Sequence, residues 1–93
     1  MSNAIITFKI MPESPDVDLD AVKEQALKIA SAQGAKGEMQ AKIEPLAFGL
    51  KQLMLLAMFE VSDDVDFDTI AEKFVSIEGV QSAEVAQMDL AMG

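Results

Sequence analysis

The feature that most restricts how this chain can fold is a short internal repeat. The segment Asp16–Asp20 (DVDLD) recurs almost unchanged, 48 residues further on, as Asp64–Asp68 (DVDFD). Each copy follows an apolar, strand-like run and opens a run with helical spacing of apolar residues. An aspartate at such a junction accepts hydrogen bonds from the first N–H groups of a helix. The repeat therefore predicts two similar strand–helix–strand halves.

The spacing of apolar residues predicts six elements, in the order strand, helix, strand, strand, helix, strand. Alternation indicates strands over Ile5–Met11, Lys36–Glu44, Leu50–Glu60 and Val80–Leu90. A helical apolar stripe covers Leu19–Gln33 and Phe67–Ile77, followed by Gly34 and Gly79 respectively. We expect one α+β domain over residues 1–93: a ferredoxin-like βαββαβ sandwich, with a four-stranded antiparallel sheet and both helices on one face.

The segment Leu50–Glu60 is apolar on both of its expected faces, which is typical of a central strand. One face carries Leu53, Leu55, Ala57 and Phe59, and the other carries Met54, Leu56 and Met58. We expect the second set, together with Ile5 and Met88, to form an apolar patch on the helix-free face. Such a patch suits a partner domain, or a second copy in a homodimer.

The connection Pro45–Lys51 is unusual because its turn is apolar. Pro45 lacks a backbone donor and Gly49 can adopt positive φ, so a tight turn between two strands is expected. Leu46 and Phe48 stand where turns are normally polar. Phe48 either folds back to cap the core or is offered to a binding partner.

The composition excludes several classes of function. The chain has no cysteine, histidine or arginine, so thiol nucleophiles, zinc clusters, imidazole bases and bidentate phosphate clamps are absent. A net charge of −9 opposes nucleic acids and anionic membranes and favours a basic protein partner. Neither a membrane-spanning run nor a secretory signal is visible, so we expect a cytoplasmic protein. We predict a non-enzyme without cofactor or metal.

The acidic turns offer one alternative. Asp63, Asp64, Asp66 and Asp68 resemble the spacing of calcium ligands, but the mid-loop glycine and final glutamate of an EF-hand loop are missing. Helix capping explains these residues better, as it does Asp16, Asp18 and Asp20. A metal- or effector-binding module remains a rival interpretation, as does a small regulatory or dimerisation module.

Three segments carry a specific resemblance to a known family. Ile10–Leu19 (IMPESPDVDL), Pro45–Lys51 (PLAFGLK) and Ile77–Val85 (IEGVQSAEV) resemble, in order and spacing, the archaeal elongation factor 1-beta family. The resemblance implies a ferredoxin-like guanine-nucleotide exchange factor for elongation factor 1-alpha, the GTPase that delivers aminoacyl-tRNA. Such a factor needs no catalytic side chain.

The resemblance also implies where the GTPase binds. The expected contacts are the loop and turn residues Pro12, Glu13, Ser14, Pro15, Asp16, Pro45, Leu46, Ala47, Phe48, Gly49 and Lys51, with Met88 and Asp89 near the C-terminus. The chain departs from the family at this end. Relatives carry basic residues there, whereas Lys73 is the last basic residue here. Exchange is therefore expected either to depend on Phe48 and the Pro12–Asp16 loop or to be weakened.

Overall fold

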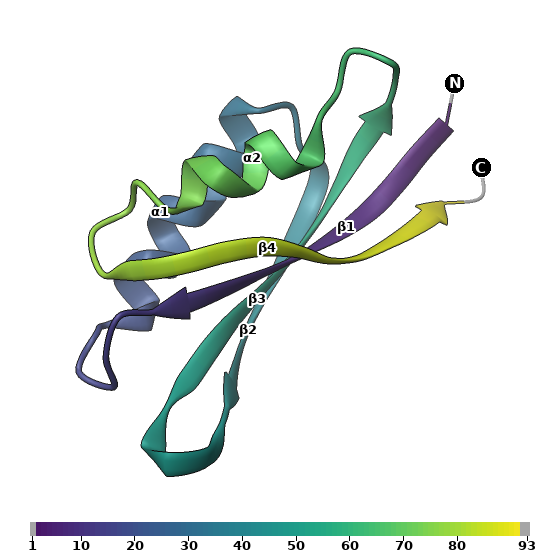
Figure 1. The fold of residues 1–93 in the computed structure, drawn as a ribbon. Helices are drawn as coiled ribbons and strands as arrows, with labels where there is room; N and C mark the ends of the chain where they lie inside the picture. Colours follow the sequence, from purple (N-terminus) through teal and green to yellow (C-terminus); the bar gives the residue numbers. More distant parts are fainter. Residues whose placement is uncertain (1, 92–93) are drawn as a thin grey trace.

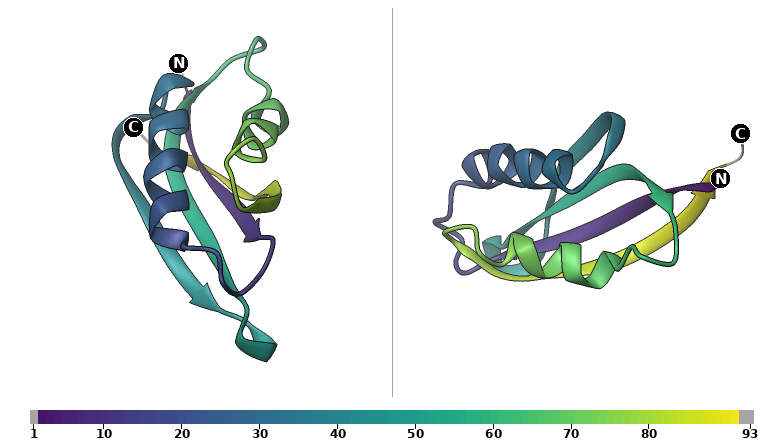
Figure 2. Two further views of the ribbon diagram at one scale, coloured as in Figure 1. Left: turned by 90° about the vertical axis from the view of Figure 1, so that its left-hand side faces the viewer. Right: turned by 90° about the horizontal axis from the view of Figure 1, so that it is seen from above.

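A computed structural model describes residues 2–91. The elements follow in the order β1 (Ser2–Pro12), α1 (Leu19–Ala32), β2 (Lys36–Pro45), the single 3₁₀ turn η1 (Ala47–Gly49), β3 (Lys51–Val61), α2 (Phe67–Phe74) and β4 (Val80–Ala91). Four antiparallel strands in the order β2-β3-β1-β4 form one sheet (Figure 1). Both helices run alongside each other on one face of it (Figure 2). The predicted ferredoxin-like fold is confirmed.

The alternation seen in the sequence decides which side chains face the helices. On β3, Leu53, Leu55, Ala57 and Phe59 are buried, and on β1 so are Ala4, Ile6, Phe8 and Ile10. The helices contribute their apolar stripes, among them Val22, Ala26, Ile70 and Phe74. Phe8 lies at the centre, where its ring packs edge-on against Phe74 at a centroid distance of 5.0 Å and against Phe59 at 6.1 Å. Such contacts between aromatic rings add to the stability gained by burial.

The two repeated aspartate segments begin the helices as expected. Asp18 Oδ1 accepts hydrogen bonds from the N–H groups of Asp20 (3.0 Å) and Ala21 (3.4 Å). Asp66 Oδ1 accepts equivalent bonds at the start of α2, also at 3.0 and 3.4 Å. Capping the otherwise unpaired N–H groups of a first turn explains why each helix starts where it does.

Two boundaries differ from the expectation by three residues. The first strand already begins at Ser2. Helix α2 ends at Phe74 rather than Ile77. Ser76 Oγ donates to the carbonyl of Lys73 (2.7 Å), and the N–H of Ile77 donates to the carbonyl of Phe74 (3.1 Å), so the chain closes in tighter turns there. Among residues 2–91, no helix is long and apolar enough to cross a membrane.

The expected position of Met88 is wrong. Thr7 lies opposite Gln87, but the next residue, Phe8, lies opposite Val85, so Ala86 is an extra residue in β4. This β-bulge moves Met88 opposite Ile6, on the helix-bearing face, instead of opposite Ile5 on the free face. The end of β4 extends beyond the helices (Figure 1), and Met88 is 49% exposed there.

Candidate partner-binding site

The β2–β3 hairpin projects beyond the rest of the domain, at the end of the sheet opposite the two termini (Figures 1 and 2). Its tip is closed by two backbone hydrogen bonds. The N–H of Leu46 donates to the carbonyl of Leu50 (2.6 Å), and the N–H of Leu50 donates to the carbonyl of Ala47 (3.3 Å). Phe48 and Gly49, which lie between Leu46 and Leu50, both have positive φ, at 63° and 76°. The tip is therefore a defined turn.

Phe48 does not cap the core. Its side chain is 96% exposed, although a phenylalanine gains most of its stabilising energy from burial. Two further large apolar residues of the same hairpin, Ile43 and Leu46, are also exposed. The interpretation that Phe48 folds back onto the domain is wrong. The hairpin end instead presents apolar side chains to solvent.

The β1–α1 loop lies at the same end of the domain. The N–H of Glu13 donates to the carbonyl of Gly79 (2.8 Å), which ties this loop to the start of β4. A shallow pocket of about 200 Å³ separates the loop from the base of the hairpin, lined by Pro12, Ser14, Pro15, Ile43 and Lys51 among others. The structure thus brings together the two sequence segments expected to contact the partner. Glu13, Pro15 and Asp16 are exposed.

Met88 and Asp89 lie elsewhere. Asp89 is opposite Ile5 on β1, whereas Leu53, two residues from Lys51, is opposite Ile10. At about 3.3 Å per residue along a strand, the level of Asp89 is roughly 23 Å from the level of Lys51. Asp89 Oδ2 accepts a hydrogen bond from Gln87 Nε2 (2.7 Å). The predicted contact residues therefore fall into two separate groups at opposite ends of an elongated domain.

The free face of the sheet has an apolar centre. Met54, Leu56 and Met58 lie there half-buried, Ile5 is exposed beside them, and Thr7 at the middle is buried. Ion pairs flank this strip on both sides: Lys9 Nζ lies 2.9 Å from Glu84 Oε1, and Lys36 Nζ lies 3.0 Å from Glu60 Oε2. The apolar patch expected on the free face is therefore present, but Met88 is not part of it.

The aspartates of the two turns do not form a metal site in the described part of the chain. No group of three Asp or Glu side chains within residues 2–91 is placed to hold a metal ion. Asp18 and Asp66 cap helices instead. The calcium interpretation is therefore not supported by the geometry.

Sequence reasoning missed the part of Gly79 in positioning the loop. Gly79 was expected only to end a helix, yet its carbonyl receives the bond from Glu13 and its φ is 93°. A Cβ atom there would lie 2.9 Å from Cγ1 of Val17, so the β1–α1 loop packs directly against the residue. The only sequence signal for this contact was the glycine itself, and a glycine after a helical run is normally assigned to ending the helix.

Comparison with known proteins gives a consistent result. Residues 5–90 match the family described as EF-1 guanine nucleotide exchange domain. Elongation factor 1-beta of Methanosphaerula palustris is 41% identical over 92 residues, covering 97% of this chain and 99% of the relative. The protein of the same name from Pyrococcus horikoshii is 36% identical over 89% of each chain. That of Archaeoglobus fulgidus is 34% identical, over 97% of this chain and 99% of the relative.

The matched region contains both exposed segments of the hairpin end, the Pro12–Asp16 loop and the Pro45–Lys51 turn. It also includes every buried apolar residue of the core except Ala4. The resemblance drawn from three short segments is thereby confirmed over nearly the full length. The chain belongs to the family of EF-1 guanine nucleotide exchange domains, and its function is guanine-nucleotide exchange in translation elongation.

Proposed function

We propose that this domain promotes the exchange of GDP for GTP on elongation factor 1-alpha and that Phe48 is its principal anchor on that GTPase. The observation that carries the proposal is an aromatic side chain that is 96% exposed and held at positive φ on a projecting hairpin. Conspicuous strain and exposure at a loop tip are typical of binding sites. Membership of the exchange family supports the identity of the partner.

The mechanism requires binding energy rather than reactive groups. An exchange factor must bind the nucleotide-free GTPase better than the nucleotide-bound one, and by linkage it weakens nucleotide binding by the same factor. Each tenfold gain in nucleotide release needs about 1.4 kcal/mol of such preference. Burying a phenylalanine in a partner supplies about 1.5–3 kcal/mol. Phe48 alone thus accounts for roughly a ten- to hundredfold effect.

The proposed interface includes more than the ring. The Pro12–Asp16 loop lies across a shallow pocket from Lys51 at the base of the hairpin, and the loop and Lys51 form the rim of the contact. The net charge of −9 steers a basic partner surface toward the domain. We assign Met88 and Asp89 to a second, separate contact at the far end. The protein accordingly works in the cytoplasm, with its GTPase, and catalyses no chemical step.

The test is the rate at which labelled GDP leaves elongation factor 1-alpha in the presence of each variant. Wild type should accelerate release, and Phe48→Ala should lose most of the acceleration while keeping its circular dichroism spectrum. Val75→Ala serves as the matched control, because Val75 is another exposed apolar residue, 41% exposed, but lies after α2. An equal loss in both variants, or no loss in Phe48→Ala, contradicts the anchor role.

A further inference from the structure

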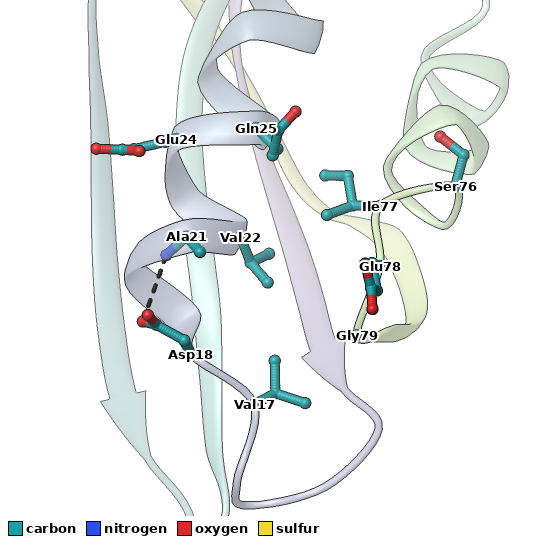
Figure 3. Close-up of a pocket in the computed structure, with 10 residues that line it drawn as sticks. All are labelled: Val17, Asp18, Ala21, Val22, Glu24, Gln25, Ser76, Ile77, Glu78 and Gly79. Carbon is teal, nitrogen blue, oxygen red and sulfur yellow. Dashed lines mark hydrogen bonds between the residues drawn. The ribbon is translucent and has the colours of Figure 1, made fainter.

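A notch of about 650 Å³ opens between the start of α1 and the loop after α2 (Figure 3). Its floor is apolar: Val17, Val22 and Ile77 point toward one another from the two sides, and Ile77 and Val22 are buried. Glu78 and Asp18 stand on the rim. The notch is at the hairpin end, beside the β1–α1 loop that we place in the GTPase interface. It therefore continues the proposed contact surface.

The chain carries a second notch of the same construction. The helix ends repeat as the helix starts do, since Ser31–Ala35 (SAQGA) corresponds to Ser76–Val80 (SIEGV). A smaller cavity of about 350 Å³ lies between the end of α1 and the start of α2, lined by Gln33, Asp64, Val65, Asp66, Thr69 and Ile70. This second notch lies at the opposite end of the helical layer. The pair provides a comparison within one molecule.

The two notches differ in charge at one equivalent position. Glu78 occupies the place in the first notch that Gln33 occupies in the second. None of the ten residues that line the first notch is a lysine, and within residues 2–91 Glu78 belongs to no ion pair. Acids line both notches: Asp18 and Glu24 beside Glu78 in the first, Asp64 and Asp66 in the second. The first is distinguished by its place at the hairpin end and by Glu78, an acid unpaired within the described residues, at the position that Gln33 holds in the second.

We propose that the first notch receives a lysine or arginine side chain of the GTPase, with Glu78 as the residue that selects it. Such side chains bury an apolar stem and keep a charged head at the surface. The stem lies over Val17, Val22 and Ile77, and the head meets the Glu78 carboxylate at the rim. The inference rests on the proposed function, because the occupant belongs to the same partner.

The experiment measures the Kd of the nucleotide-free GTPase for each variant at several salt concentrations. Glu78→Gln makes the first notch resemble the second and should raise the Kd about tenfold, the usual effect of losing a hydrogen bond to a charged group. It should also flatten the dependence of log Kd on log salt. Gln33→Glu adds an acid at the equivalent position of the other notch and should leave both quantities unchanged. Denaturation midpoints of Glu78→Gln should match wild type, because Glu78 is exposed.

A Kd within twofold of wild type for Glu78→Gln, with the same salt dependence, overturns the inference. So does an equal effect of Gln33→Glu, since that would make overall charge the cause. These results leave the proposed function intact if Phe48→Ala still loses GDP release. Conversely, if Glu78→Gln raises the Kd while Phe48→Ala keeps full activity, the anchor role of Phe48 is rejected and the binding of a basic side chain in the first notch is supported. A wild-type chain that does not bind the GTPase contradicts both.

Discussion

Phe48 and Gly49 occupy the left-handed region of backbone space in succession, at φ of 63° and 76°. Glycine adopts this conformation readily, whereas a residue with a Cβ atom is destabilised there by roughly 1–2 kcal/mol. The ring of Phe48 recovers none of this energy by packing within the domain, because it is 96% exposed. The hairpin tip is therefore less stable than it would be with glycine at position 48.

Replacing Phe48 should separate stability from function. Asparagine tolerates positive φ, so Phe48→Asn should raise the free energy of unfolding by about 0.5–1 kcal/mol while exchange falls. Phe48→Val should lower it, because a β-branched residue is poorly suited to that conformation. Guanidinium denaturation of both variants checks the prediction. The account of strain fails if valine is tolerated as well as asparagine.

The two helix caps offer a graded comparison. Asp18→Ala and Asp66→Ala should each lower the free energy of unfolding by about 1 kcal/mol. Asp66→Ala should lower the free energy of unfolding further than Asp18→Ala, because Asp66 Oδ2 also accepts a hydrogen bond from Thr69 Oγ1 at 3.0 Å. The measurement is the denaturation midpoint of each variant. Equal losses would show that the Thr69 bond contributes nothing measurable.

Gly79→Ala should be more harmful than Gly34→Ala. Both glycines have positive φ, at 93° and 106°, so each alanine suffers the same kind of backbone strain. A Cβ atom at Gly79 also lies 2.9 Å from Val17 Cγ1, whereas one at Gly34 meets nothing within 4 Å. Overpacking of this kind costs about 1–3 kcal/mol. The difference between the two unfolding free energies measures it, and a difference near zero contradicts the contact.

The free face of the sheet leads to a prediction about association. We propose that two copies pair weakly through the strip around Leu56, and that each copy's charge of −9 opposes the pairing. Sedimentation at micromolar to millimolar concentration should show a dimer that increases with salt, because salt screens the repulsion. Leu56→Lys should leave monomers. A wild-type chain that remains monomeric at every salt and protein concentration would refute this proposal.

The fold was predictable because local and global preferences agree in this chain. Alternation along β3 placed Leu53, Leu55 and Phe59 in the core, and the repeated aspartates marked both helix starts. The bulge at Ala86 left only a weak signal in the sequence: Val85 and Ala86 are adjacent apolar residues that shift the alternation by one position, while neither a glycine nor a proline marks the site. One inserted residue reverses the face of every later side chain, and Met88 was misplaced for that reason.

The candidate site was predictable only as separate segments. The apolar turn around Phe48 stood out because turns are normally polar, but its exposure depends on how far the hairpin extends past the sheet. The proximity of the Pro12–Asp16 loop to Lys51 and the tie between Glu13 and Gly79 arise from tertiary packing. No local pattern encodes these contacts between residues distant in the sequence.

The most direct test of the central claim is single-turnover release of labelled GDP from elongation factor 1-alpha, with the residue at position 48 shortened in steps. Release should be fastest with wild type, slower with Phe48→Leu, and close to the unassisted rate with Phe48→Ala, a fall of about ten- to hundredfold. Equal rates for wild type and Phe48→Ala, with both chains folded, would contradict it.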